Sequence, residues 1–194
     1  MKVAIVKYNA GNTASVANAL RRLGADPVIT GDAETLRFAD RVIFPGVGEA
    51  STAMDYLRER GLCGVIRSLK QPVLGVCLGM HLLCASSDEN DAECLGILPF
   101  RVKRFEGGEL KVPHVGWNSV TEFRGPLFEG VVEGSHVYFV HGYYVEASEH
   151  TTAACDYGVK FSAAISHENF HAVQFHTEKS GPVGERILQN FLNL

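Results

Sequence analysis

The sequence predicts an α/β fold in three layers, with a mostly parallel central sheet, helices on both faces, and a β-rich, partly antiparallel second half. In the first half, short apolar runs rich in β-branched residues alternate with helical patterns, as in parallel strands joined by right-handed crossovers. From about residue 95 to residue 178, strand-like pieces dominate instead. No linker, repeat or low-complexity tract divides the chain, so residues 1–194 are predicted to form one domain.

The first half is predicted to begin with a strand at residues 2–7, a nearly continuous apolar run that suits a strand covered on both faces. The apolar positions that follow have helical spacing, with Asn12 as the expected N-cap and Gly24 as the stop. The other expected elements are strands at 27–30, 41–44 and 72–76 and helices at 51–60 and 78–83.

The second half is predicted to consist of short β segments and one closing helix. The closing helix is amphipathic and covers residues 183–194. The β segments are expected at 101–105, 111–115, 136–145, 160–166 and 171–177.

Composition excludes several classes of protein. The 194 residues are 46% apolar, and 18 basic residues against 22 acidic ones give a net charge of −4, so nothing favours binding to nucleic acid or to an anionic membrane. The five cysteines form no CxxC pair, and no apolar stretch approaches the roughly 20 residues of a membrane span. With no recognisable signal peptide, the expected location is the reducing cytoplasm.

Cys77 is the strongest candidate for chemistry because it lies between a predicted buried strand and a predicted helix. Gly75 and Gly79 flank it at two residues on either side and permit a sharp turn, which is the arrangement of a nucleophile elbow with cysteine in place of serine. A thiol at a helix N-terminus faces backbone N–H groups that favour the thiolate. The N–H of Leu78 is also well placed to stabilise an oxyanion formed by attack of Cys77.

His176 and Glu178 are the candidate base and the group that orients it. If residues 171–178 form one strand, Gln174, His176 and Glu178 share one face, while Val173 and Phe175 face the core. Glu178 can then bind one imidazole nitrogen and leave the other for Cys77, which completes the logic of a catalytic triad.

The segment from His167 to His171 matches the H-E-x-x-H zinc pattern. Zinc binding by this pattern requires a helix, whereas the segment lies between two strand-like runs with Glu168-Asn169 as a natural hairpin turn. We therefore expect a hairpin here, with neither metal nor other cofactor.

Taken together, these residues resemble the triad (class I) glutamine amidotransferases, and within them the glutaminase subunits of imidazole glycerol phosphate synthase. The resemblance runs over essentially the whole chain. It is carried by the segments YNAGN (8–12), PGVG (45–48), GVCLGM (75–80), PHVGWN (113–118), YFVHGYY (138–144) and QFHTEKS (174–180).

The resemblance implies a flavodoxin-like fold and a glutaminase with Cys77 as nucleophile, His176 as acid–base and Glu178 as its partner. It places the oxyanion hole at Val47, Gly48 and Leu78. It places L-glutamine near Gly46, Gly48, His81, Glu89, Gly142 and Tyr143, with Glu89 near the α-amino group. His81 departs from the family pattern, which generally has glutamine there, and Thr177 replaces the usual proline.

The resemblance also implies a heterodimer with a (β/α)8-barrel cyclase subunit, which receives the ammonia and makes imidazole glycerol phosphate and an aminoimidazole carboxamide ribonucleotide. Trp117 and Lys179 are expected near that interface, although a packed tryptophan and a solvated lysine explain them equally well.

Three alternatives stay open. The chain can be a triad amidotransferase subunit that serves anthranilate, aminodeoxychorismate, purine or pyridoxal phosphate synthesis. It can be a cysteine-elbow peptidase or stress protein on a similar sheet, or a catalytically inactive binding subunit.

Overall fold

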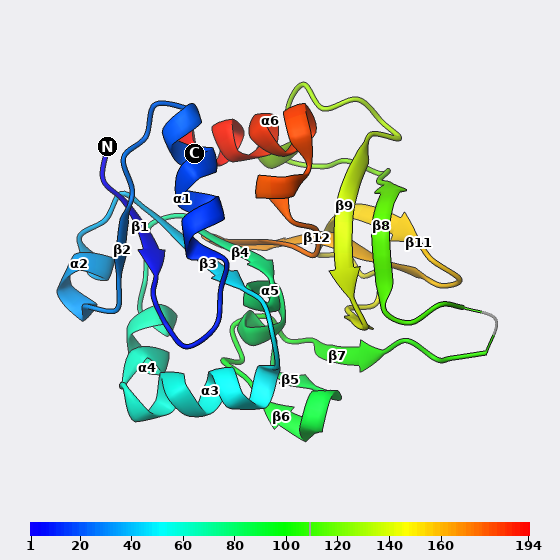
Figure 1. Cartoon of the computed structure of the whole chain (residues 1–194), viewed down its shortest axis with the longest axis horizontal. Helices are drawn as coiled ribbons and strands as arrows, with labels where there is room; N and C mark the ends of the chain where they lie inside the picture. The colour runs from blue at the N-terminus through cyan, green and yellow to red at the C-terminus, as the bar shows by residue number, and fades with distance from the viewer. Residues whose placement is uncertain (109) are drawn as a thin grey trace.

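The computed structural model describes residues 1–108 and 110–194, and its largest element is a seven-stranded sheet (Figure 1). Five adjacent strands run parallel, and the other two continue the sheet in antiparallel pairing at one edge. In spatial order the strands are β11 (Thr151–Asp156), β12 (Lys160–His167), β13 (Phe170–Val173), β4 (Val73–Cys77), β3 (Arg41–Gly46), β1 (Val3–Val6) and β2 (Val28–Thr30). The predicted three-layer α/β class is confirmed.

Helices cover both faces of the sheet. On β1, Val3 and Ile5 pack on one side and Ala4 and Val6 on the other, because successive side chains of a strand point to opposite faces. The side of Val3 and Ile5 carries α1 (Thr13–Arg22) and α6 (Gly181–Leu192). The opposite side carries α2 (Ala33–Arg37), α3 (Ala50–Glu59), α4 (Leu62–Arg67) and α5 (Leu78–Leu83).

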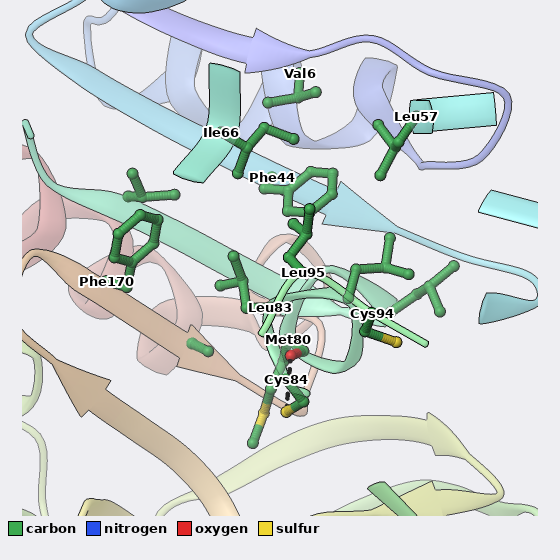
Figure 2. Packing of buried hydrophobic residues seen from close by; sticks show 14 of the residues in the cluster. Val6, Phe44, Leu57, Ile66, Met80, Leu83, Cys84, Cys94, Leu95 and Phe170 are labelled. Atoms are coloured by element: carbon green, nitrogen blue, oxygen red, sulfur yellow. Dashed lines mark hydrogen bonds between the residues drawn. The ribbon is translucent and has the colours of Figure 1, made fainter. Parts of the chain in front are cut away.

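The layer under α2–α5 is a continuous apolar core. Figure 2 shows Phe44 of β3 among Val6 of β1, Leu57 of α3 and Ile66 of α4. All four side chains are fully or almost fully removed from solvent. Burial of this kind holds the helices to the sheet, at about 1.5–3 kcal/mol for each large apolar side chain.

Two smaller sheets and three short 3₁₀ turns complete the described chain. The ribbon of β8 (His114–Ser119) and β9 (His136–His141) is antiparallel and lies on the α1–α6 side. The second small sheet contains β10 (Tyr143–Tyr144), β7 (Arg101–Arg104), β5 (Ser86–Ser87) and β6 (Ala92–Glu93). The turns are η1 (Glu89–Asp91), η2 (Pro126–Phe128) and η3 (Thr177–Lys179).

The structure corrects the prediction for residues 171–178. The strand there is β13, which ends at Val173, and residues 177–179 form the turn η3 instead of a strand. The chain leaves β4 because the His176 N–H donates to the carbonyl of Tyr138 on β9, 2.9 Å away. The hairpin between β12 and β13 is confirmed, with His167 paired to Phe170 around Glu168-Asn169.

Asn12 occupies the predicted N-cap position of α1, but it does not make the expected capping hydrogen bond through its side chain. Asn12 precedes the helix and its carbonyl accepts from the Val16 N–H, but its side chain makes no capping hydrogen bond. At the other end the Gly24 N–H donates to the Arg21 carbonyl, with φ of 81° at Gly24. None of the helices formed by the described residues has the length and apolarity to cross a bilayer.

Candidate active site

Three neighbouring parallel strands bring the candidate residues together. The register pairs Gly46 of β3 with Cys77 of β4, and Val76 of β4 with Val173 of β13. The segments that follow β3, β4 and β13 therefore leave the sheet side by side at its carboxyl edge. This edge is where open α/β sheets bind ligands, and here it receives Val47-Gly48, Cys77 and His176.

Cys77 occupies a strained turn between β4 and α5. Its φ is 54° and its ψ is −111°, outside the regions that residues with a side chain usually occupy. Such a conformation costs about 1–3 kcal/mol and persists only where packing enforces it. Packing does so here, since a Cβ at Gly79 would lie 1.8 Å from the Phe44 carbonyl oxygen. This close contact with the backbone of β3 accounts for glycine at position 79.

A cavity of about 300 Å³ opens at this edge, and most of the predicted site residues line it. Every residue predicted for the triad, the oxyanion hole or the substrate site lines this cavity, except Gly46 and Glu178. The predicted interface residue Lys179 lines it as well. Pro113, Val140 and His141 line it without having been assigned a site role. The predicted residues in the wall are Val47, Gly48, Cys77, Leu78, His81, Glu89, Gly142, Tyr143 and His176.

The two exceptions lie directly behind the wall. Gly46 pairs with Cys77 in the sheet and cannot take a side chain, because a Cβ there would lie 2.5 Å from the Tyr8 hydroxyl and 2.6 Å from Leu78 Cβ. That hydroxyl donates to the Pro45 carbonyl over 2.8 Å and anchors the strand end from which Val47 and Gly48 project. Gly48 has φ of 105°, so the turn at this point favours glycine.

His176 and Glu178 form a hydrogen-bonded pair, although not from one strand. Nδ1 of His176 lies 2.9 Å from Oε1 of Glu178, and both side chains are almost fully buried. Burial disfavours the imidazolium, but the interactions of His176 with Cys77 and Glu178 outweigh it and raise the pKa of His176 to about 9. Burial is the largest single influence on Glu178 and opposes its ionisation, but the hydrogen bond and the charge of His176, together with weaker hydrogen bonds, outweigh burial and lower the pKa of that carboxyl.

Glu178 has a second polar neighbour, Asn12, which sequence reasoning assigned only to the start of α1. Nδ2 of Asn12 donates to Oε1 of Glu178 over 3.3 Å. Oε2 of the same carboxylate is buried without a hydrogen-bond partner among the described residues. Gln174, expected on the same face, does not join this group.

Gln174 instead contacts His81. Nε2 of His81 lies 2.7 Å from Oε1 of Gln174, and both side chains are buried. Burial is the main influence on His81 and lowers its pKa to about 4, so the ring is neutral at physiological pH. His81 therefore offers the cavity an uncharged imidazole.

Glu89 faces the cavity from η1, and its Oε2 accepts from the Ala50 N–H at the start of α3 over 2.8 Å. Partial burial raises the pKa of Glu89, although the bond from Ala50 opposes this effect. The carboxylate is thus fixed in the wall, where it can receive an ammonium group.

Two buried histidines support the part of the cavity wall that contains Gly142 and Tyr143. His141 Nδ1 lies 2.7 Å from the Tyr143 carbonyl, so it donates, and its Nε2 accepts from His114 Nδ1 over 3.0 Å. Burial lowers the pKa of His114 to about 4 and that of His141 to about 3, so both rings are neutral. This chain of hydrogen bonds fixes the Gly142-Tyr143 segment of the cavity.

An exposed apolar surface adjoins the cavity mouth. On the ribbon, Val115 pairs with Val140 and Trp117 with Tyr138, and we call these four residues the ribbon patch. Val115 and Trp117 are each more than half exposed, at 54% and 56%. Val140 also belongs to the cavity wall, and the ammonium of Lys179 lies 5.9 Å from the centre of the Tyr138 ring. Trp117 itself does not line the cavity.

Within the described residues, no group of three or more histidine, cysteine, aspartate or glutamate side chains is arranged to hold a metal ion.

Residues 4–194 match the family described as Glutamine amidotransferase class-I. An Imidazole glycerol phosphate synthase subunit HisH of Bacteroides fragilis (strain YCH46) is 56% identical over 196 residues, covering 100% of both chains. A protein of the same name from Shewanella sediminis is 44% identical, covering 98% of this chain and 89% of the relative.

Solved structures share the fold at lower identity. A structure described as a glutamine amidotransferase has a TM-score of 0.77 at 22% identity, covering 98% of this chain and 97% of its own. A chain in the structure of PurLQS from Thermotoga maritima has a TM-score of 0.73 at 18% identity, covering 99% of this chain and 97% of its own.

Proposed function

Because the chain belongs to the class-I glutamine amidotransferase family, we propose that it hydrolyses L-glutamine to glutamate and ammonia by means of Cys77, His176 and Glu178. One observation carries this assignment. A cysteine on a strained strand–helix turn and a histidine backed by a buried carboxylate face the same cavity at the carboxyl edge of a parallel sheet. That combination supplies a nucleophile, an acid–base and a group that orients it.

In the first half-reaction the Cys77 thiolate attacks the carboxamide carbon of glutamine, and the C=O π electrons move to oxygen. The tetrahedral intermediate collapses with cleavage of the C–N bond, and His176 gives its proton to the departing nitrogen, which leaves as ammonia. The raised pKa of His176, about 9, supports this role because the ring carries that proton at neutral pH.

In the second half-reaction the neutral His176 takes a proton from water, and the resulting hydroxide attacks the γ-glutamyl thioester. Glutamate leaves and the thiolate–imidazolium pair is restored. Glu178 accepts from His176 Nδ1 throughout, which keeps Nε2 directed at the reacting atoms.

The oxyanion of both intermediates is assigned to backbone N–H groups of Leu78 and of Val47-Gly48. Leu78 is the first residue of α5, where N–H groups lack intrahelical partners. One such donor typically contributes about 3 kcal/mol to the transition state. The substrate is assigned to Gly46, Gly48, His81, Glu89, Gly142 and Tyr143, with Glu89 receiving the α-ammonium group.

The ammonia is assigned to a partner enzyme, the (β/α)8-barrel cyclase subunit of imidazole glycerol phosphate synthase in histidine biosynthesis. The names of the HisH relatives support this choice. The ribbon patch supports a docked partner, because exposed aromatic and aliphatic side chains beside a cavity mouth are typical of interfaces. Docking there covers Lys179 and Trp117 and shields ammonia from protonation in bulk water.

A coupled assay tests the proposal: purified cyclase and its ribonucleotide substrate are mixed with this chain and glutamine, and glutamate and cyclised product are measured together. We expect Cys77→Ala to abolish both products with glutamine and to leave product formation with ammonium salts intact. Cys63→Ala is the matched control, because Cys63 lies on α4 and does not line the cavity. Glutamate release that survives Cys77→Ala would contradict the assignment.

A further inference from the structure

Asn12 makes a contact that its place in the sequence does not require. It precedes α1, where an asparagine side chain normally accepts from a backbone N–H of the first turn. The side chain of Asn12 makes no such bond and donates instead to Glu178, 166 residues further along the chain. The helix thus forgoes a local stabilising contact in favour of one to the carboxylate behind His176.

The carboxylate of Glu178 has few other means of staying in place. Its side chain is 1% exposed, so water does not solvate it. Oε1 accepts from both His176 and Asn12, whereas Oε2 has no partner among residues 1–108 and 110–194. A buried charge is costly unless hydrogen bonds compensate it. Asn12 therefore supplies one of the two side-chain donors to this group, which also interacts with its own backbone N–H.

We propose that Asn12 is a positioning residue of the Cys77–His176–Glu178 site, holding the Glu178 carboxylate in the orientation that fixes the His176 ring. The inference rests on the proposed function and extends it to a residue that touches neither substrate nor the reacting atoms. With both side-chain donors on Oε1, the carboxylate is restrained by His176, which precedes η3, and by Asn12, which precedes α1.

The consequence is a defined ranking of substitutions at position 12. Serine and aspartate cap helices about as well as asparagine, and alanine caps poorly. A serine is too short to reach Glu178, and an aspartate brings a second negative charge to the position of the amide. If Asn12 only caps α1, activity is similar with Asn, Asp or Ser at position 12 and lower with Ala. If Asn12 positions Glu178, activity is highest with Asn, lower and similar with Ser and Ala, and lowest with Asp.

The experiment compares N12S, N12A and N12D in the assembled complex. We expect N12S and N12A to lower kcat for glutamine about tenfold, the effect of a hydrogen bond to a charged group, with KM changed less than twofold. N12D is expected to lower kcat further, and ammonia-dependent product formation is expected to stay unchanged in all three variants.

A readout independent of turnover is the rate of Cys77 alkylation by iodoacetamide as a function of pH, followed by mass spectrometry of the Cys77 peptide. Loss of the Asn12 donor leaves the Glu178 carboxylate less well oriented toward the imidazolium that faces the thiolate, so the alkylation profile is expected to move to higher pH in N12S and N12A. Thermal unfolding of each variant reports helix capping separately.

The outcomes separate this inference from the function on which it rests. If Cys77→Ala leaves glutaminase activity intact, the proposed function fails. Suppose that Cys77→Ala and Glu178→Gln abolish or strongly reduce activity, while N12S and N12A match the parent in kcat and in alkylation profile. In that case only the role of Asn12 is overturned. Activity that follows the capping order overturns it too.

Discussion

The hydrogen bond between His176 and Glu178 predicts that replacing the Glu178 carboxylate changes the pKa of His176. Glu178→Gln keeps the shape of the side chain and an oxygen that can accept from Nδ1, but removes the charge. The structure raises the pKa of His176 from 6.5 to about 9 against the effect of burial. At about 1.4 kcal/mol for each pKa unit, Cys77 and Glu178 together favour the imidazolium by roughly 3 kcal/mol net.

If the two partners contribute equally, the variant loses at least half of that support. We therefore expect the pKa of His176 to fall by roughly one unit or more, which corresponds to about a tenfold change in its protonation equilibrium. Because the folded pKa of the native protein lies above the unfolded value, this stabilisation is complete below pH 6.5 and is lost as pH rises through about 9. The dependence of unfolding free energy on pH in this window should be shallower in the variant.

The assay is an NMR titration of imidazole ¹³Cε1 signals, with His176→Asn used to assign the resonance. The buried His81, His114 and His141 have pKa values lowered to about 4, 4 and 3, so they do not titrate near the pH range of interest. A native His176 that titrates at or below 6.5, or one that Glu178→Gln leaves unmoved, would refute the electrostatic reasoning.

Two further predictions concern packing and docking. Gly79→Ala should destabilise the fold by more than about 3 kcal/mol, because its Cβ would lie 1.8 Å from the Phe44 carbonyl. The helical control Gly64→Ala, with nothing within 4 Å of its Cβ, should stabilise by about 0.5–1 kcal/mol; urea unfolding measures both, and equal effects would contradict the argument. Trp117→Ala should weaken binding of the cyclase by about 2 kcal/mol or more, measured by calorimetry, as expected of a central aromatic contact. Phe38→Ala, which removes another exposed aromatic, should leave that affinity unchanged, and a similar loss in both variants would argue against docking at the ribbon patch.

The Cys77 turn could be predicted because its determinants are local. An apolar strand, a cysteine between two glycines and a helical run all lie within residues 72–83, and the close approach of Gly79 to Phe44 follows from the sharpness of that turn. The parallel half of the sheet was predictable for the same reason, since each strand and each crossover has its own short-range pattern.

The surroundings of His176 could be predicted only in part. The pairing with Glu178 is correct, but strand geometry was the wrong reason for it. The end of β13 depends on the bond from the His176 N–H to Tyr138, which lies on a distant strand and leaves no periodic signal in the sequence. The contact of Asn12 with Glu178 is equally long-range, and the local pattern indicated only a helix cap.

The short helices α2 and α4 were missed because helices of five or six residues lack the length that periodicity requires. One signal was available: Asp32 accepts from the Thr35 N–H as a regular N-cap. Gly61 follows α3 and provides the left-handed residue before α4.

The insertion of β13 between β12 and β4 has a consequence for how the protein is made. Strand β4, which ends at Cys77, is synthesised early. Strand β13, its neighbour in the sheet, is among the last segments to be synthesised. A nascent chain that ends before residue 170 has an open sheet edge at β4 and no imidazole opposite the thiol. Premature termination therefore yields fragments that lack His176 and Glu178 and that expose a strand edge prone to aggregation.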